Sequence, residues 1–371
     1  MGNGLRKWRY LQILVIFISW IWLSCAGIGT GSKNMMFRLD AAHRGISPAA
    51  PLKQLNGVAW EFQTGDWVFA SPLVFNETVY VASLDNHLYA LNGHNGELLW
   101  KFNARGKLYA TPAVTSDLIF IVTEGGHCYA LDHTGAIIWH RALKSRVFAS
   151  PVVSGDMVFI PTVKGDLFAL NTANGNPEWT FHAENGITST PAVKGGKIFF
   201  GSWDGNVYAL KKKNGEVVWK YPTPNWVISS PAVYKGKVFI GGLDGNFYAL
   251  SEDKGTVIWK FETRDQIRSS PAVSKEGVYF GGIDGRFYAL NLENGQENWH
   301  FDIDDQIDGS PVVAQDVVYF GGVDGRLYAL DRYTGKKLWV FKSGGRIYAT
   351  PFVWRGMVIF GSRDGKVYAL H

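Results

Sequence analysis

The sequence repeats itself with a period of about 40 residues. Each copy ends in a tryptophan, and successive ones lie 40, 39 and then five times 40 residues apart. These tryptophans are Trp60, Trp100, Trp139, Trp179, Trp219, Trp259, Trp299 and Trp339. A period of this length indicates a solenoid or a propeller, and the turns inside each copy decide between the two.

Each copy contains four short apolar runs separated by turn residues. In the seventh copy the runs are Pro311–Val313, Val317–Phe320, Leu327–Leu330 and Leu338–Phe341. Short runs rich in Val, Ile, Tyr and Phe and bounded by Gly and Asp are typical of strands. Asp-Gly pairs at 204–205, 244–245, 284–285, 324–325 and 364–365 favour tight hairpins, because they tolerate positive φ angles. Four antiparallel strands per copy predict a propeller blade.

The eighth copy is incomplete, since it ends at His371 without a closing tryptophan. A strand-like run at residues 58–62 has no preceding Tyr-Ala-Leu and is the candidate for the missing strand. We therefore predict an all-β fold. It is an eight-bladed β-propeller of four-stranded antiparallel blades, covering residues 56–371 and closed by the N-terminal strand. Closure removes sheet edges that would otherwise invite aggregation.

The run Ala329-x-Asp331-x-x-Thr334-Gly335-x-x-x-Trp339 resembles the tryptophan-docking motif of the pyrroloquinoline-quinone-type (PQQ-type) propeller family. It recurs at 90–100, 169–179, 209–219, 249–259 and 289–299, and one residue shorter at 130–139. The resemblance implies that each tryptophan packs structurally between neighbouring blades.

This family includes long quinoprotein dehydrogenases and the outer-membrane assembly lipoprotein of the β-barrel assembly machinery. The dehydrogenases often carry two adjacent cysteines, whereas this chain has only Cys25 and Cys128. Its size and single ring are more similar to the assembly lipoprotein. The resemblance thus implies a non-catalytic scaffold for protein–protein interaction, without a cofactor. A PQQ-dependent dehydrogenase using PQQ and calcium, or a propeller that binds a sugar or small ligand, remain open alternatives.

Residues 1–26 have the pattern of an export signal, with Arg6, Lys7 and Arg9 before the apolar run 10–23. Three fates are open: lipidation of Cys25 within a lipobox-like Leu-Ser-Cys, cleavage as an ordinary signal peptide, or retention as a membrane anchor. Each places the propeller in the cell envelope, facing the periplasm or the exterior. Lipidation would make it an outer-membrane lipoprotein. Residues 27–55 show no strand pattern and are predicted to be a flexible tether.

The formal net charge of +5 comes from the N-terminus. Residues 1–55 hold seven Lys and Arg against one acid, which leaves the propeller at −1. A nearly neutral ring argues against nucleic-acid binding and leaves an envelope protein as the expected partner. We expect a monomeric ring.

The residue three positions before each strand-opening proline varies inside an otherwise strict repeat. These residues are Phe69, Tyr109, Phe148, Thr188, Ile228, Arg268, Asp308 and Tyr348. Trp67 and Trp226 belong to the same loops, and Trp203 lies in the neighbouring turn between the second and third strands. We expect the aromatic residues, with Arg268 and Asp308, to form a binding face around the channel mouth. In the alternative, they fill the wide centre of the ring.

Motifs for catalysis or metal binding are missing from the sequence. The acidic loop with Asp302, Asp304, Asp305 and Asp308 lacks the glutamate that ends a calcium loop, so we expect it to be a solvated surface. The nine histidines show no zinc-ligand spacing, and no nucleophile elbow or phosphate loop occurs. We predict neither a catalytic site nor a metal.

Overall fold

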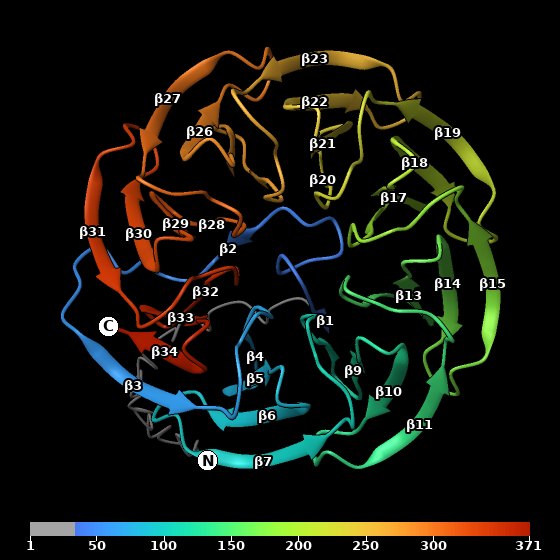
Figure 1. Cartoon of the computed structure of the whole chain (residues 1–371), viewed down its shortest axis with the longest axis horizontal. Coiled ribbons are helices and arrows are strands. Elements are labelled where there is room, and N and C mark those ends of the chain that lie inside the picture. The colour runs from blue at the N-terminus through green and yellow to red at the C-terminus, as the bar shows by residue number, and fades with distance from the viewer. Residues whose placement is uncertain (1–33) are drawn as a thin grey trace, which may run out of the picture. The chain divides into compact units, whose positions relative to one another are not determined.

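The computed structural model describes residues 34–371, which form strands, turns and loops and no helix. Eight sheets stand around a central channel, each contributing one blade to the ring (Figure 1). The blades follow one another in sequence order, with the first strand of each at the channel and the last at the rim. The predicted eight-bladed propeller is confirmed.

The four-stranded unit recurs with nearly constant strand lengths. Blade 1 consists of β4 (Leu73–Phe75), β5 (Thr78–Ala82), β6 (His87–Asn92) and β7 (Leu98–Asn103). Blade 2 consists of β8 (Ala113–Thr115), β9 (Ile119–Val122), β10 (His127–Leu131) and β11 (Ile137–Ala142). Blade 3 consists of β12 (Val152–Ser154), β13 (Met157–Pro161), β14 (Asp166–Asn171) and β15 (Pro177–His182). Blade 4 consists of β16 (Ala192–Lys194), β17 (Lys197–Gly201), β18 (Asn206–Lys211) and β19 (Val217–Pro222).

The second half of the ring repeats this pattern. Blade 5 consists of β20 (Ala232–Tyr234), β21 (Lys237–Gly241), β22 (Asn246–Ser251) and β23 (Val257–Glu262). Blade 6 consists of β24 (Ala272–Val273), β25 (Val278–Gly281), β26 (Arg286–Leu290) and β27 (Glu297–Asp302). Blade 7 consists of β28 (Val312–Ala314), β29 (Val317–Gly321), β30 (Arg326–Asp331) and β31 (Lys337–Lys342). Blade 8 consists of β32 (Phe352–Trp354), β33 (Met357–Gly361), β34 (Lys366–Leu370) and, from the other end of the chain, β3 (Val58–Gln63).

The Asp-Gly turn illustrates why one local sequence recurs in the blades. In blade 5, Gly245 has φ +77°, a left-handed conformation that glycine adopts at little cost. The Asp244 carboxylate accepts the backbone N–H of Asn246 at 3.1 Å and the hydroxyl of Tyr248 at 2.5 Å. Burial, followed by this carboxylate, raises the pKa of Tyr248 far above its usual value. The aspartates of these turns are therefore structural.

Each closing tryptophan docks on the next blade, as the family motif implies. Trp219 donates its indole N–H to the carbonyl of Glu252 at 3.1 Å, in the turn between the third and fourth strands of blade 5. A Cβ on Gly255 would lie 2.5 Å from the Trp219 ring, so only glycine fits beneath the indole. The other tryptophans of the motif make the equivalent hydrogen bond 33 residues ahead, except Trp339.

Two contacts close the ring. Strand β3 pairs antiparallel with β34, which confirms that residues 58–62 supply the missing strand. Blade 8 has no turn for Trp339 to dock on, and the carbonyl of Leu52 takes its place. This carbonyl accepts the Trp339 indole N–H at 2.8 Å and the Tyr319 hydroxyl at 3.0 Å. The N-terminal segment therefore completes both the sheet and the tryptophan docking of the last repeat.

A belt of hydrogen bonds joins the blades around the channel. Its members are the Ser or Thr before each strand-opening proline. Each donates its backbone N–H to the hydroxyl of its counterpart on the next blade, from Ser71 to Thr111 and so on to Thr350, which donates to Ser71. Outside this belt, aromatic side chains stack between blades, such as Phe247 on Phe280 with centroids 4.2 Å apart. Among residues 34–371 no helix is long and apolar enough to span a membrane.

Candidate recognition face and the filled channel

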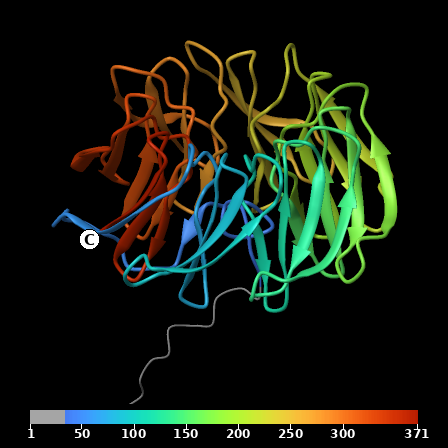
Figure 2. The same cartoon turned by 60° about the horizontal axis from the view of Figure 1, so that its bottom comes forward.

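The loops between blades lie on one face of the ring together with the turns between second and third strands. We call this the loop face. Backbone hydrogen bonds hold the two sets together, such as Trp203 N–H to the Gly186 carbonyl at 2.8 Å and Leu243 N–H to the Trp226 carbonyl at 2.9 Å. The other turns lie on the opposite face, where Gly93 N–H bonds the Glu77 carbonyl. Figure 2 shows the ring tilted.

Four of the predicted aromatic residues form a continuous crescent on the loop face, across the closure of the ring. Tyr348 stacks on Phe69 with centroids 4.9 Å apart and an interplanar angle of 17°. Phe69 meets Tyr109 edge-on at 5.8 Å, and Tyr109 meets Phe148 edge-on at 5.3 Å. All four side chains are half-buried, so each ring presents part of its surface to solvent.

Cations cover both ends of this crescent. The Arg363 guanidinium lies 3.4 Å from the Trp67 ring centroid and 5.8 Å from that of Tyr348. At the other end, Arg146 lies 4.8 Å from the centroid of Phe148. Sequence reasoning missed Arg363, although a signal existed. It stands directly before the Asp-Gly of the eighth copy, the position that Trp203 takes in the fourth.

Trp203 and Trp226 form a second aromatic platform on the loop face. Their rings stack with centroids 5.1 Å apart and an interplanar angle of 9°. The Trp203 indole N–H donates to the Thr188 hydroxyl at 2.9 Å, which fixes the inner ring. Trp226 is 45% exposed, much like Trp67 at 42%. The outer indole therefore offers a fixed, flat apolar surface.

Arg268 and Asp308 lie on neighbouring blades but form no ion pair among the described contacts. Burial raises the pKa of the half-buried Asp308, and the positive charge of Arg268 partly opposes this. Arg268 is exposed and donates to the side-chain oxygen of Gln266 at 3.2 Å. The two side chains are thus electrostatically linked without direct contact.

The channel itself is occupied by the chain's own N-terminal segment, seen in blue inside the ring (Figure 1). Strand β1 (Asn34–Met35) pairs antiparallel with β8, and β2 (Ile46–Ser47) pairs parallel with β28. The prediction of a flexible tether over 27–55 is therefore wrong from residue 34 onward, because backbone pairing holds this part to the ring. Residues 27–33 and the predicted lipidation site Cys25 lie outside the described residues.

Between these two strands the segment gives carbonyl groups to successive blades. The carbonyls of residues 41, 42, 44 and 45 accept the backbone N–H groups of one valine in each of blades 4, 5, 6 and 7. These valines are Val193, Val233, Val273 and Val313, with N···O distances of 2.5, 2.9, 2.8 and 2.9 Å. The segment is therefore bound by main-chain hydrogen bonds around half of the channel wall.

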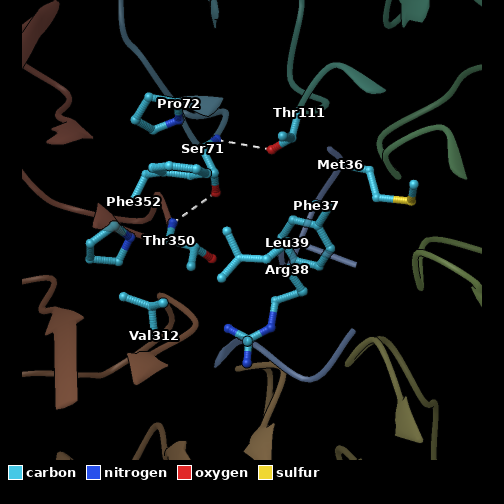
Figure 3. A pocket seen from close by; sticks show the side chains of 12 residues that line it. Met36, Phe37, Arg38, Leu39, Ser71, Pro72, Thr111, Val312, Thr350 and Phe352 are labelled. Atoms are coloured by element: carbon cyan, nitrogen blue, oxygen red, sulfur yellow. Dashed lines mark hydrogen bonds between the residues drawn. The ribbon is translucent and has the colours of Figure 1, made fainter. Parts of the chain in front are cut away.

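Two basic side chains of the segment are buried in the channel. Arg38 donates to the carbonyls of Pro271 and Pro311, and its burial lowers its pKa to about 9. His43 is fully buried, and burial followed by the charge of Arg38 lowers its pKa to about 3. A cavity of about 10 Å³ remains beside Arg38, room for a single water at most (Figure 3). Residues 34–47 thus occupy the channel that the crescent aromatics were the alternative candidates to fill.

Potential metal ligands do not gather in the described part of the chain: no three His, Cys, Asp or Glu side chains are placed to hold an ion within 34–371. His127 and His140 approach each other, with Nδ1 and Nε2 3.0 Å apart. Between them in the sequence, Cys128 is buried, which raises the pKa of its thiol.

With the fold and the loop face described, relatives can be compared. The family model described as outer membrane protein assembly factor BamB matches residues 53–108, 94–190 and 179–371. The chain belongs to this family. A search of curated proteins finds no match.

Solved structures share the fold at low sequence identity. BamB from Moraxella catarrhalis is 20% identical with a TM-score of 0.73, over 85% of this chain and 99% of that one. The computationally designed protein Ika8 is 15% identical with a TM-score of 0.77, over 85% and 99%. The quinohemoprotein alcohol dehydrogenase ADHIIG from Pseudomonas putida HK5 is 15% identical with a TM-score of 0.78, over 91% and 80%. Identities this low establish the fold alone.

Proposed function

We propose that this protein is an exported, membrane-tethered and non-catalytic scaffold for outer-membrane protein assembly, which uses its loop face to bind a protein partner in the cell envelope. The observation that carries the proposal is that the assembly-factor family model matches from residue 53 to the C-terminus. The single ring without an added domain agrees with it.

The loop face supports a role in binding extended protein segments. The crescent and the Trp203–Trp226 platform together present fixed aromatic rings, which are enriched where proteins bind each other. Arg146 and Arg363 add positive charge at both ends of the crescent. This chemistry suits a partner segment in which apolar side chains alternate with acidic ones.

Binding is tested with an unfolded outer-membrane barrel protein diluted from urea, and with the purified barrel-forming component of the assembly machinery. We expect the double variant Tyr109→Ala/Tyr348→Ala to weaken at least one of these complexes by about tenfold or more, since two half-buried aromatic contacts are lost. A matched control is Tyr333→Ala, which removes a 57% exposed tyrosine outside the loop face. Unchanged binding of both partners by a folded double variant would refute the crescent as the binding face.

The quinone-dependent alternative is tested on the same preparation. PQQ and calcium are added and uptake is followed by absorbance and native mass. The cofactor of such an enzyme stacks on an aromatic ring in the channel, and here residues 34–47 lie in the channel. We expect no stoichiometric uptake. Uptake together with alcohol-dependent reduction of an electron acceptor would replace the scaffold by an enzyme.

A further inference from the structure

The wall of the channel is a ring of open strand edges. The innermost strand of each blade pairs on one side only with its own sheet, and an equivalent valine lies two residues after each strand-opening proline. These valines are Val74, Val114, Val153, Val193, Val233, Val273, Val313 and Val353. Open edges offer backbone N–H and C=O groups that an extended chain can bind.

Residues 34–47 use this wall as a peptide ligand would. Their carbonyls accept one valine N–H from each of four successive blades, and the Arg38 guanidinium donates to proline carbonyls of two further wall positions. We propose that the channel wall is a binding site for an extended polypeptide segment that carries an arginine, and that residues 34–47 occupy it as an intramolecular ligand. This inference does not depend on the proposed function.

The bound segment carries features of an exchangeable ligand. Arg38, Leu39 and His43 adopt positive φ angles of 62°, 75° and 56°, which side chains other than glycine rarely take. Arg38 Nε and both ring nitrogens of His43 are buried without a hydrogen-bond partner. Backbone strain and unpaired buried polar atoms weaken the hold of the segment on the wall, and they are typical of switchable positions. A second segment without these defects would compete for the same groups.

The wall also restricts what the ligand can be. A Cβ on Gly45 would lie 2.2 Å from Arg38 Nη2, so a side chain at this position would displace the guanidinium from the proline carbonyls. Ala41 and Ala42, which give the preceding carbonyls, are small as well. The site therefore fits an arginine followed by small residues in an extended conformation.

The test uses the full-length chain and a fluorescent synthetic peptide of residues 34–48. We expect the variant Arg38→Ala to bind this peptide at least about tenfold more tightly than the wild-type chain, because its own segment competes less well. The matched control peptide carries the same Arg38→Ala change, and we expect its affinity for the variant to fall by about tenfold or more. The variant Arg38→Lys, which keeps the charge, provides a second receptor in case the alanine variant does not fold.

A second readout needs no variant. Saturating peptide should leave the amides of Val193, Val233, Val273 and Val313 protected from hydrogen exchange, whereas residues 34–47 lose protection. Equal affinity of both peptides for a folded variant would overturn the proposal, as would no binding to either variant. An unfolded partner that still binds the loop face in that case would leave the proposed function intact.

Discussion

The buried His43 predicts how the protein responds to acid. Its imidazole is fully buried, and its pKa is lowered to about 3 from an ordinary value of 6.5 by burial and by Arg38. The neutral form is therefore favoured in the folded state. Unfolding takes up a proton at any pH between these two values, so stability is fully present above pH 6.5 and is lost as the pH falls towards 3.

The size of this loss follows from the two pKa values. Each pH unit within the window costs about 1.4 kcal/mol, which gives about 2 kcal/mol between pH 7 and pH 5 and about 3 kcal/mol between pH 7 and pH 4. Denaturant unfolding at these pH values measures it. Other groups also titrate in this range, so the comparison must be made with a variant that lacks only the imidazole.

His43→Phe is that variant, because it fills a similar volume without a titratable or hydrogen-bonding group. We expect it to abolish the 2 kcal/mol share of the pH dependence, and to be at least as stable as wild type at pH 7, since two unpaired buried nitrogens are removed. If local release of residues 34–47 costs less than 2 kcal/mol, the loss stops at that cost, and the amide of Val233 becomes exchangeable at pH 5. Identical pH profiles with a protected Val233 amide would refute the reasoning.

Three substitutions test the repeat itself by denaturant unfolding. Gly255→Ala should cost about 3 kcal/mol, because its Cβ meets the Trp219 ring, whereas Gly236→Ala, with a similar φ of +73° and nothing within 4 Å, should cost only about 1 kcal/mol; equal costs would show that the indole yields. Ser270→Ala should cost about 1–2 kcal/mol, since it leaves a buried amide of the belt unpaired, and a cost near zero would mean that water replaces the hydroxyl. Tyr248→Phe should cost about 1–2 kcal/mol by removing a donor from the turn carboxylate, and a neutral outcome would contradict the structural role of that turn.

The blades could be predicted because each marker residue acts locally. The Asp-Gly pair sets a hairpin by its own φ angles, and the strand after it ends at the next turn signal. The predicted run 317–320 thus differs from β29 (Val317–Gly321) by a single residue. The tryptophan reports a contact with the next blade, which a strict spacing makes visible.

The crescent was predictable for the opposite reason. Within a strict repeat, a position that varies is free of the fold's requirements, and Tyr348 and Phe69 become neighbours only through the inferred closure of the ring. The same reasoning would have found Arg363 had the position before Asp-Gly been compared across all copies. It could not show that Asp308 and Arg268 lie near each other without pairing, since this depends on side-chain rotamers.

The N-terminal segment could not be predicted, because its binding partner exists only in the finished ring. Arg38 bonds the carbonyls of residues 233 and 273 positions ahead, and Ser47 bonds Val353 306 positions ahead. No local pattern encodes such contacts, and Gly, Ser and Pro without periodicity read as a tether.

The same distances determine when the segment can bind. Residues 34–57 are synthesised first, but their partners Trp339, β28 and β34 are synthesised last, so the channel wall stays open until all eight blades are formed. Contacts of such high sequence separation form late, because the entropy of closing a long loop must be overcome first. An open wall of strand edges during folding is available to any extended chain. The strained segment 34–47 is therefore the ligand that reaches the wall at the highest effective concentration, and its covalent attachment offsets its imperfect fit.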